Sequence, residues 1–218
     1  MGIRTIATCA ATAAIASLSA CTYNVPLSAQ SGAAEVMSTK ATKGSAYIVM
    51  SPELSSLGRT VKPGLICGAH SYPIYAGDVI RSSLIKTLEG AYSSVSASDS
   101  LPTAAQGPVF KFDVADFDPR LRFAQGFWSG SADANVDLAI RARVTSPTGA
   151  ELITTTFRGQ GHGSEDGQGC GMGADALSDA AAKAIRSAME NFVDKVINTG
   201  ALQQPIAQTT QAATASAK

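Results

Sequence analysis

Two cysteines and two histidines are the residues of this sequence whose types and spacing could do chemistry. His70 follows Cys67 by three positions, and His162 precedes Cys170 by eight. Thiolate and imidazole groups form Cys₂His₂ zinc sites, and the first spacing is reasonable for a metal pair while the second is not. In an oxidising compartment the same two thiols would form a disulfide instead. The four residues therefore present a choice between a metal site and a covalent cross-link.

We expect the cross-link, with Cys67 bonded to Cys170 and with no metal ion or other cofactor. Such a bond would close a loop of about 100 residues, for which chain-entropy estimates give about 4–5 kcal/mol of stabilisation. It would hold the glycine-rich segment around Cys170 against the loop that precedes the first predicted long helix. Two separate thiols, bridges between molecules and a structural zinc site are the alternatives.

The glycine-rich segment, Gly159–Gly173, lies between a predicted strand and a predicted helix, where a phosphate-binding loop would lie. Its spacing differs from that of such loops, because no G-x-G-x-x-G occurs and no Gly-Lys-Ser/Thr follows. Glu165 and Asp166 also place negative charge where a phosphate would bind. We interpret the segment as a connecting loop with no nucleotide partner, whose exposed backbone could contact another protein.

Aromatic side chains are concentrated in residues 117–128, together with two arginines. The candidate partner-binding residues are Phe123, Phe127 and Trp128, the only tryptophan of the chain. Aromatic and arginine side chains contribute much of the binding energy at protein interfaces, and tryptophan is frequent where a protein meets a membrane. The alternative is a hairpin that packs these rings into its own core.

The other polar residues give little support to catalysis. No G-x-S-x-G nucleophile motif is present, and both histidines lie near cysteines that we assign to a structural bond. Asp113, Asp116 and Asp118 follow one another in and after a predicted strand without an acid–base partner, which is typical of a solvated strand edge. We therefore expect a protein that is not an enzyme.

Charge and hydropathy restrict the partners of the chain. Its 218 residues include 17 Lys+Arg and 17 Asp+Glu, so no basic excess exists to neutralise nucleic-acid phosphates. No run of about 18 strongly apolar residues is present, which excludes a membrane protein with several spans. With 45% hydrophobic residues, the chain can form the core of one folded domain.

Alternating strands and helices must position these residues. Ala134–Val144 alternates apolar and polar side chains most clearly, and the turn signal at 146–149 predicts that the next strand returns antiparallel. Apolar residues spaced four apart predict amphipathic helices at Asp78–Tyr92 and Asp175–Asn198. The order β-α-β-β-β-α predicts an α+β fold with a small, mostly antiparallel sheet and two main helices on one face. The remaining strands are expected at Ala46–Met50, Ser93–Ser98, Val109–Phe117 and Glu151–Phe157.

The N-terminal residues have the pattern of an export signal. Arg4 precedes an alanine-rich apolar stretch, and Leu18-Ser19-Ala20-Cys21 follows it. This run resembles the lipobox of bacterial lipoproteins, in which an aliphatic residue and two small residues precede a cysteine. The resemblance implies that residues 1–20 are a signal peptide and that Cys21 is lipidated, and several acyl chains anchor a protein stably. An ordinary secretory signal, cut after Ala16 or Ser19, is the alternative.

The lipobox also predicts where the protein lies and how the rest of the chain is divided. Thr22 follows the cysteine, and in Gram-negative lipoproteins this resembles an outer-membrane sorting context, with the protein on the periplasmic face. Residues 21–44 are small and polar, which is typical of a flexible tether, here one that carries the lipid. Residues 45–198 are expected to form the periplasmic domain and residues 199–218 a disordered tail.

The lipobox, the tether and the order of elements together resemble the lipoproteins that assist outer-membrane assembly, of the curli-secretion, exopolysaccharide-export and lipopolysaccharide-assembly types. The resemblance lies in element order rather than in a motif. It implies a non-enzymatic outer-membrane lipoprotein that serves as an assembly, secretion or scaffold accessory, with the membrane and an envelope protein or further copies of itself as partners. The alternative function is a periplasmic binding module for a lipid, a glycan or a small envelope ligand.

Overall fold

The computed structural model describes residues 21–28, 42–98, 100, 105–126, 129–199 and 202. The predicted signal peptide and residues 203–218 of the predicted tail lie outside them. The elements run in the order β1 (Thr42–Met50), α1 (Pro52–Ser55), β2 (Gly58–Val61), β3 (Tyr72–Tyr75), α2 (Gly77–Glu89), β4 (Tyr92–Ser98), β5 (Val109–Gln125), β6 (Gly130–Thr145), β7 (Glu151–Gly167) and α3 (Met172–Phe192), which continues as a π-helical segment at Val193–Ile197. Within these residues, no helix combines the length and the hydropathy that a bilayer crossing requires.

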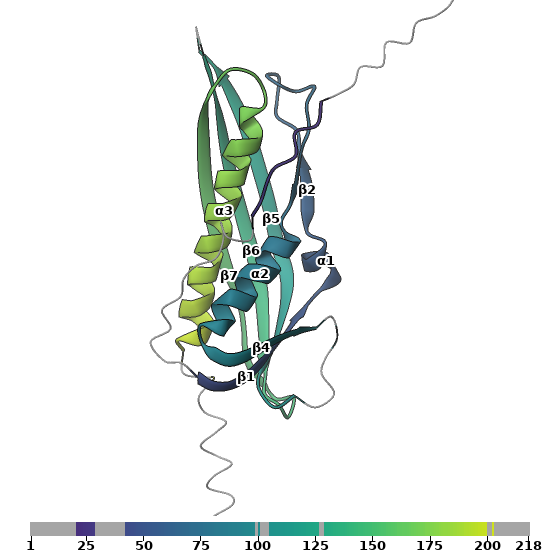
Figure 1. The fold of residues 1–218 in the computed structure, drawn as a ribbon, viewed down its shortest axis with the longest axis vertical. Helices are drawn as coiled ribbons and strands as arrows, with labels where there is room; N and C mark the ends of the chain where they lie inside the picture. The colour runs from purple at the N-terminus through teal and green to yellow at the C-terminus, as the bar shows by residue number, and fades with distance from the viewer. Residues whose placement is uncertain are drawn as a thin grey trace, which may run out of the picture.

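A five-stranded sheet forms one layer of the fold, and α2 and α3 lie together across one of its faces (Figure 1). The strand order is β4-β1-β5-β6-β7. β1 runs parallel to both of its neighbours, whereas β5, β6 and β7 are joined by hairpins and pair antiparallel over much longer ladders. The predicted α+β class is therefore confirmed, with the addition that the β1 pairings are parallel.

The alternation predicted for the central strand is confirmed in β6. Its inward side chains are buried, and they are Ala134, Val136, Leu138, Ile140, Ala142 and Val144. The turn that follows is closed by a hydrogen bond from the Gly149 amide to the Ser146 carbonyl at 2.9 Å. Gly149 has φ +89°, a left-handed conformation that glycine adopts without steric cost. The chain then returns as the antiparallel strand β7, as expected.

The glycine-rich segment is not the loop that its composition predicted. β7 continues through it as far as Gly167 and pairs with β6 along that whole length. The reason is that three of its glycines lie at alternate positions, 159, 161 and 163, and so on one face of the strand. That face meets α3, and the absence of side chains there is what lets the two backbones come together.

The contact between β7 and α3 is so close that no side chain would fit between them. A Cβ atom at Gly159 would lie 2.0 Å from the Ala184 carbonyl oxygen, and one at Gly161 would lie 1.9 Å from that of Ala180. A Cβ atom at Gly163 would similarly meet Ala176. Two residues of strand and four residues of helix both advance by about 6 Å, so the glycines and alanines stay aligned as the two elements run antiparallel.

Toward the end of α3, beyond the glycine contacts, aromatic rings fill the layer between the helix and the sheet. Phe192 of α3 lies 5.1 Å from the ring of Phe157 and 5.5 Å from that of Phe112, measured between centroids. Phe110 completes the cluster, and all four rings are fully buried. α3 thus contacts the sheet through alanine backbone beside the three glycines and through the Phe192 ring near its end.

Side chains of α3 and of the π-helical segment that continues it also cover the outer edge of β7. Lys183 donates to the His162 carbonyl at 2.9 Å, Asn191 to that of Arg158 at 3.0 Å, and Lys195 to that of Thr156 at 3.4 Å. Alternate residues of an antiparallel edge strand point their carbonyls away from the sheet, and these three are such residues. An open strand edge invites pairing with another chain, so these bonds protect β7 from such pairing.

The structure contains a small hairpin that the sequence patterns did not predict. β2 pairs antiparallel with β3, and both are only four residues long. Residues 51–64 contain two prolines and two glycines, which are typical of a loop and conceal the strand β2. The predicted first helix is shorter than expected, since Gly90 ends it and Tyr92 begins β4 instead.

The glycine contact gives the first prediction. Replacing Gly161 with Ala should lower the free energy of unfolding by at least about 2 kcal/mol, because the new methyl group must push the backbone of α3 away from β7. Replacing Gly64 with Ala is the matched control, since a Cβ atom there would meet nothing within 4 Å. Urea denaturation of both variants measures the difference, and equal stability would contradict the proposed backbone contact.

Candidate functional site

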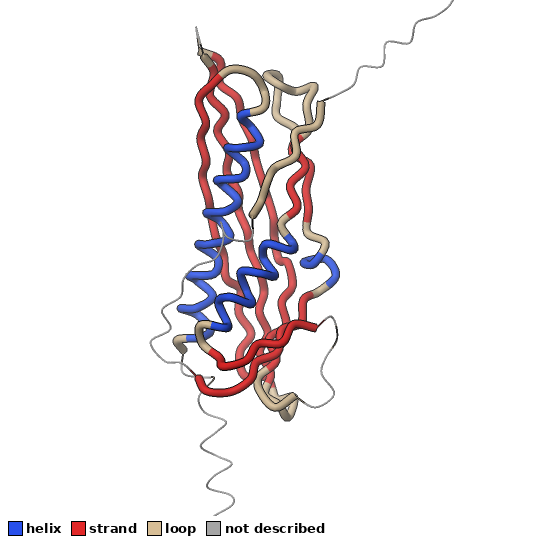
Figure 2. The backbone as a smooth tube through the Cα atoms, viewed as in Figure 1, coloured by secondary structure: helices blue, strands red, loops and turns tan. Residues whose placement is uncertain are grey.

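Three segments that are far apart in the sequence gather at one end of the sheet (Figure 2). They are residues 21–24, the β2–β3 loop at 62–71 and the β7–α3 connection at 168–171, and we call this the disulfide end. A hydrogen bond from the Tyr23 amide to the Ser71 carbonyl (2.9 Å) joins the first two segments. The disulfide joins the second to the third.

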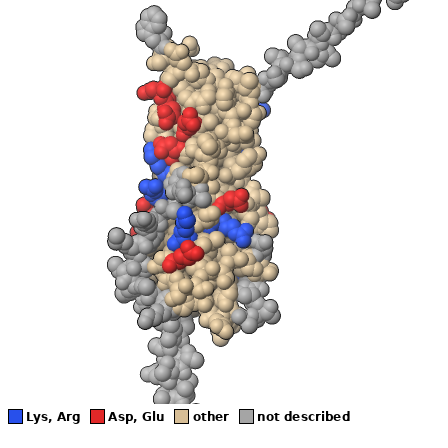
Figure 3. Space-filling view, in the orientation of Figure 1, with Lys and Arg blue, Asp and Glu red and all other residues tan. Residues whose placement is uncertain are grey.

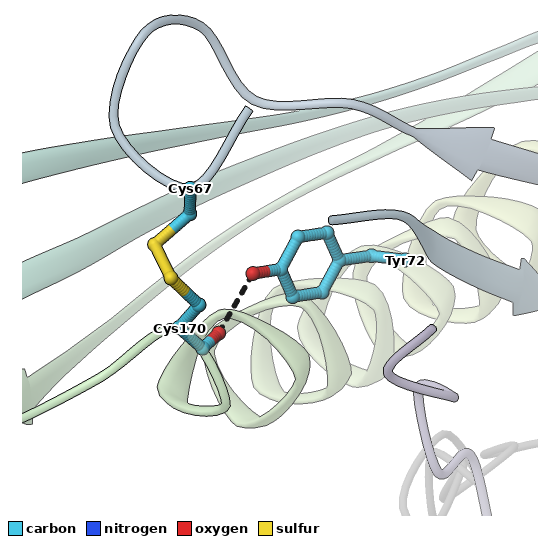
Figure 4. The surroundings of a disulfide bond; sticks show 3 residues. All are labelled: Cys67, Tyr72 and Cys170. Atoms are coloured by element: carbon cyan, nitrogen blue, oxygen red, sulfur yellow. Dashed lines mark hydrogen bonds between the residues drawn. A yellow bond between two sulfur atoms is a disulfide. The ribbon is translucent and has the colours of Figure 1, made fainter. Parts of the chain in front are cut away.

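The disulfide predicted between Cys67 and Cys170 is present (Figure 4). Their Cα atoms lie 5.7 Å apart, and the bond links positions 103 residues apart in the sequence. The buried hydroxyl of Tyr72 donates a hydrogen bond to the Cys170 carbonyl at 2.7 Å. This bond connects β3 to the segment before α3, in addition to the disulfide. Cys67 itself has φ +58°, a left-handed conformation that is uncommon for a residue with a side chain.

The histidines do not join these cysteines as ligands. The two sulfur atoms are bonded to each other, so neither is a thiolate. The ring of His70 lies edge-on to Tyr23 at 5.3 Å, while His162 lies on the uncovered face of the sheet, 3.2 Å from the Asn135 side-chain oxygen. Among the described residues, no three His, Cys, Asp or Glu side chains are grouped as metal ligands.

The residues that follow Cys21 lie on the folded domain. Beyond the Tyr23 bond, the Val25 amide donates to the Pro73 carbonyl at 3.1 Å, and the Val25 side chain is buried. The Tyr23 ring stacks on Tyr72 with centroids 5.6 Å apart. On the other side, Ser178 of α3 donates to the carbonyl of Pro26. Residues 22–27 of the predicted tether are thus docked between the β2–β3 hairpin and α3.

Of the predicted partner-binding residues, the structure describes Phe123. Phe127 and Trp128 lie outside the described residues. Phe123 is half-buried with its ring centroid 6.1 Å from that of Tyr72, so it faces the domain. It lines a cavity of about 340 Å³ together with Ile66, the disulfide and Met172. A role for the three residues in partner binding stays a prediction.

The face of the sheet opposite α3 carries rows of polar side chains from β5, β6 and β7. Gln160 donates to Asp137 at 2.7 Å, and Ser164 donates to Asp133 at 2.9 Å. The pair of His162 and Asn135 lies between the Gln160–Asp137 pair and the Ser164–Asp133 pair. A hollow of about 500 Å³ opens on this face, and its walls include Arg120, Arg122, Asp133, Asn135, Asp137, Gln160 and His162.

The chemistry of this hollow is that of hydrogen bonding. Arg120 donates to the carboxylate of Asp118, and this hydrogen bond, with the charge of the same carboxylate, raises the pKa of Arg120. Asp113 and Asp116 are exposed to solvent, as expected for a strand edge. Paired amide, carboxylate, guanidinium and imidazole groups suit a polar, uncharged or zwitterionic ligand, such as one rich in hydroxyl groups.

Sequence reasoning missed this face because the glycines were interpreted as a loop. From 159 to 164 the sequence alternates glycine with Gln160, His162 and Ser164, a period of two that is typical of a strand. The polar positions of that pattern are the ones that point away from α3. The sequence of β6 has the same alternation, so its pattern and that of residues 159–164 together predict two neighbouring strands with polar side chains on one face.

Comparisons with known proteins assign no family. No protein-family model and no curated protein sequence matches the chain. A solved structure from Helicobacter pylori, described as a neuraminyllactose-binding hemagglutinin homolog, has a TM-score of 0.38 and 8% identity, covering 72% of this chain and 88% of its own. A minor lipoprotein from Acinetobacter baumannii has a TM-score of 0.35 and 9% identity, covering 70% and 91% respectively. Both scores are below 0.5, so neither likeness assigns a ligand or a location.

Two buried tyrosines predict how stability depends on pH. Burial raises the pKa of Tyr92 to about 12. The pKa of Tyr72 is also raised to about 12, mainly by burial and to a smaller extent by the neighbouring Tyr23. The unfolded chain therefore loses these protons first, near its ordinary value of 10.0, and stability should fall as the pH rises from there toward about 12.

Replacing Tyr92 with Phe separates the two contributions. The Tyr92 hydroxyl has no hydrogen-bond partner among the described residues, so the variant should be at least as stable as the natural protein near neutral pH. It should also lose less stability at about pH 11. Tyr72→Phe is the comparison: it loses the bond to Cys170 and should be less stable near neutral pH, and it too should lose less stability at about pH 11. Urea denaturation measures all three proteins, and an unchanged alkaline slope in Tyr92→Phe would contradict the assignment.

Proposed function

We propose that this chain is a lipid-anchored protein of the bacterial outer membrane that acts by binding, not by catalysis, as an accessory to envelope assembly, secretion or scaffolding. Its lipid is attached at Cys21, and its domain lies on the periplasmic face. Its protein partner, an envelope protein or further copies of itself, is expected to contact the domain away from the anchor.

The observation that carries this proposal is the position of Cys21 relative to the domain. Its side chain is exposed, and its carbonyl accepts a hydrogen bond from the Ser71 amide at 3.3 Å. Thr22 forms a parallel bridge with the same residue. The lipobox cysteine is thus accessible for acylation while the next residues already belong to the fold. Such an arrangement suits a domain held at a fixed position on a membrane.

The hollow on the polar sheet face supports a second candidate function, a binding module for a small envelope ligand. Its volume of about 500 Å³ lies within the range typical of ligand sites. The hydrogen-bonding groups of its walls favour a glycan over a lipid, because apolar side chains of the sheet point to the other face, toward α3.

Replacing Cys21 with Ala tests the anchor. The variant should leave the membrane fraction for the soluble periplasmic fraction, because it can no longer carry acyl chains. Replacing Cys9 with Ala is the matched control, since Cys9 belongs to the predicted signal peptide and the variant should stay with the membrane. Cell fractionation and intact-mass analysis measure both variants. Membrane retention of the Cys21 variant would contradict the anchor.

The mass of the native complex separates the two functions. The lipidated protein, extracted in mild detergent, should elute as a closed oligomer or with a stoichiometric protein partner if it is an assembly accessory. Light scattering with identification of co-eluting molecules gives the answer. A monomer that retains a glycan would instead support the binding module.

A further inference from the structure

An exposed pair of apolar side chains lies at the disulfide end, beside the proposed anchor. Leu65 is 104% exposed and Ile66 is 40% exposed, and with Tyr75 they are the large hydrophobic side chains most open to solvent among the described residues. Gly64 precedes the pair, and a Cβ atom there would meet nothing within 4 Å, so this part of the loop projects away from the domain. Nothing in the core requires Leu65 to be apolar.

The same loop is directly connected to Cys21. Its last residue, Ser71, donates to the Cys21 carbonyl at 3.3 Å, and its side chain lies 3.3 Å from the Thr22 hydroxyl. The disulfide at Cys67 fixes the middle of the loop to the beginning of α3. Figure 1 shows the loop between β2 and β3 and the first described residues together at the top of the molecule. The loop therefore keeps a constant position relative to the cysteine.

The charges at this end suit a lipid surface. Residues 21–28, 62–71 and 168–171 contain no aspartate or glutamate, and Lys62 is their single lysine or arginine. In Figure 3 the acidic side chains of the upper half gather to the left, over α3, and not on the side above β2 where the loop lies. A membrane surface attracts lysine and disfavours carboxylates. The side of the domain that carries the loop therefore has charges that are compatible with a bilayer.

We propose that Leu65 and Ile66 insert into the lipid leaflet that holds the acyl chains on Cys21, so that the domain rests on the membrane by a second contact. This inference rests on the proposed function, because the acyl chains bring the loop to the surface. Shallow insertion of a few apolar side chains is a common mode of interfacial binding, and here the bonds from Ser71 to Cys21 and Thr22 keep the loop beside the anchor.

The second contact fixes the orientation of the domain. An anchor alone would let the domain rotate about residue 21, whereas an anchor and a loop hold it. Since β5 has 17 residues and runs along the long axis of the molecule, the end that carries β1 and β4 would be held roughly 50 Å from the leaflet. The polar face of β5, β6 and β7 would then stand steeply to the membrane and remain open to the periplasm.

A tryptophan placed in the loop tests the insertion. The full-length lipidated protein is prepared as Leu65→Trp in a Trp128→Phe background, which leaves one tryptophan, and is reconstituted in vesicles of acyl-brominated phosphatidylcholine. The matched control is Tyr75→Trp in the same background, because Tyr75 is 72% exposed at the opposite end of the β2–β3 hairpin. Both positions are solvent-exposed, so both variants should fold.

Fluorescence at position 65 should be blue-shifted and quenched roughly two-fold by the brominated lipid, while fluorescence at position 75 should be unchanged. Equal fluorescence at both positions in protein whose intact mass includes the acyl chains would overturn the insertion and leave the anchor standing. If the mass lacks acyl chains, the proposed anchor fails. The inference then fails together with the anchor, because it places the loop in the leaflet that holds those chains.

Discussion

The close approach of β7 to α3 is the contact on which the rest of the structure depends. Because Gly159, Gly161 and Gly163 have no side chains, the helix backbone lies almost against the strand, with Ala180 and Ala184 as its nearest residues. This proximity brings the lysines and the asparagine of α3 within reach of the strand carbonyls. It also means that the side chains between the glycines, Gln160 and His162, point away from the helix and lie on the open face of the sheet.

The two ends of this contact are secured by different means. Where the layer is thin, small residues of α3 pack directly on the strand, and the Cys67–Cys170 bond and the Tyr72 hydroxyl fasten the beginning of the helix. Where the layer is thick, Phe157 and Phe192 supply burial instead. The disulfide and this hydrogen bond therefore hold the loops at that end in a defined arrangement, next to the side chains of Leu121 and Phe123 that lie against Gly173.

Sequence patterns predicted the elements whose side chains alternate or repeat in the ordinary way. β6, the hairpin to β7, α2 and the long C-terminal helix were all identified from apolar spacing, and the disulfide from the cysteine count. The glycine part of β7 was missed because a strand that contacts a helix through its backbone has no apolar residues to reveal its inner face. The β2–β3 hairpin was missed because four-residue strands lack a measurable period, and the exposure of Leu65 because an apolar residue in a loop gives no sign of its surroundings.

The position of the disulfide also affects the stability of the fold before and after oxidation. Cys67 and Cys170 are 103 residues apart in the sequence, and β3, most of the sheet and the α2 helix lie between them, so folding of these elements brings the two thiols together. In a reducing cytoplasm both sulfurs stay as thiols, and this end of the helix–sheet layer lacks its covalent bond. If the chain is exported as proposed above, the reduced form would be easier to unfold for passage through a translocation channel, and later oxidation would make the folded form persist.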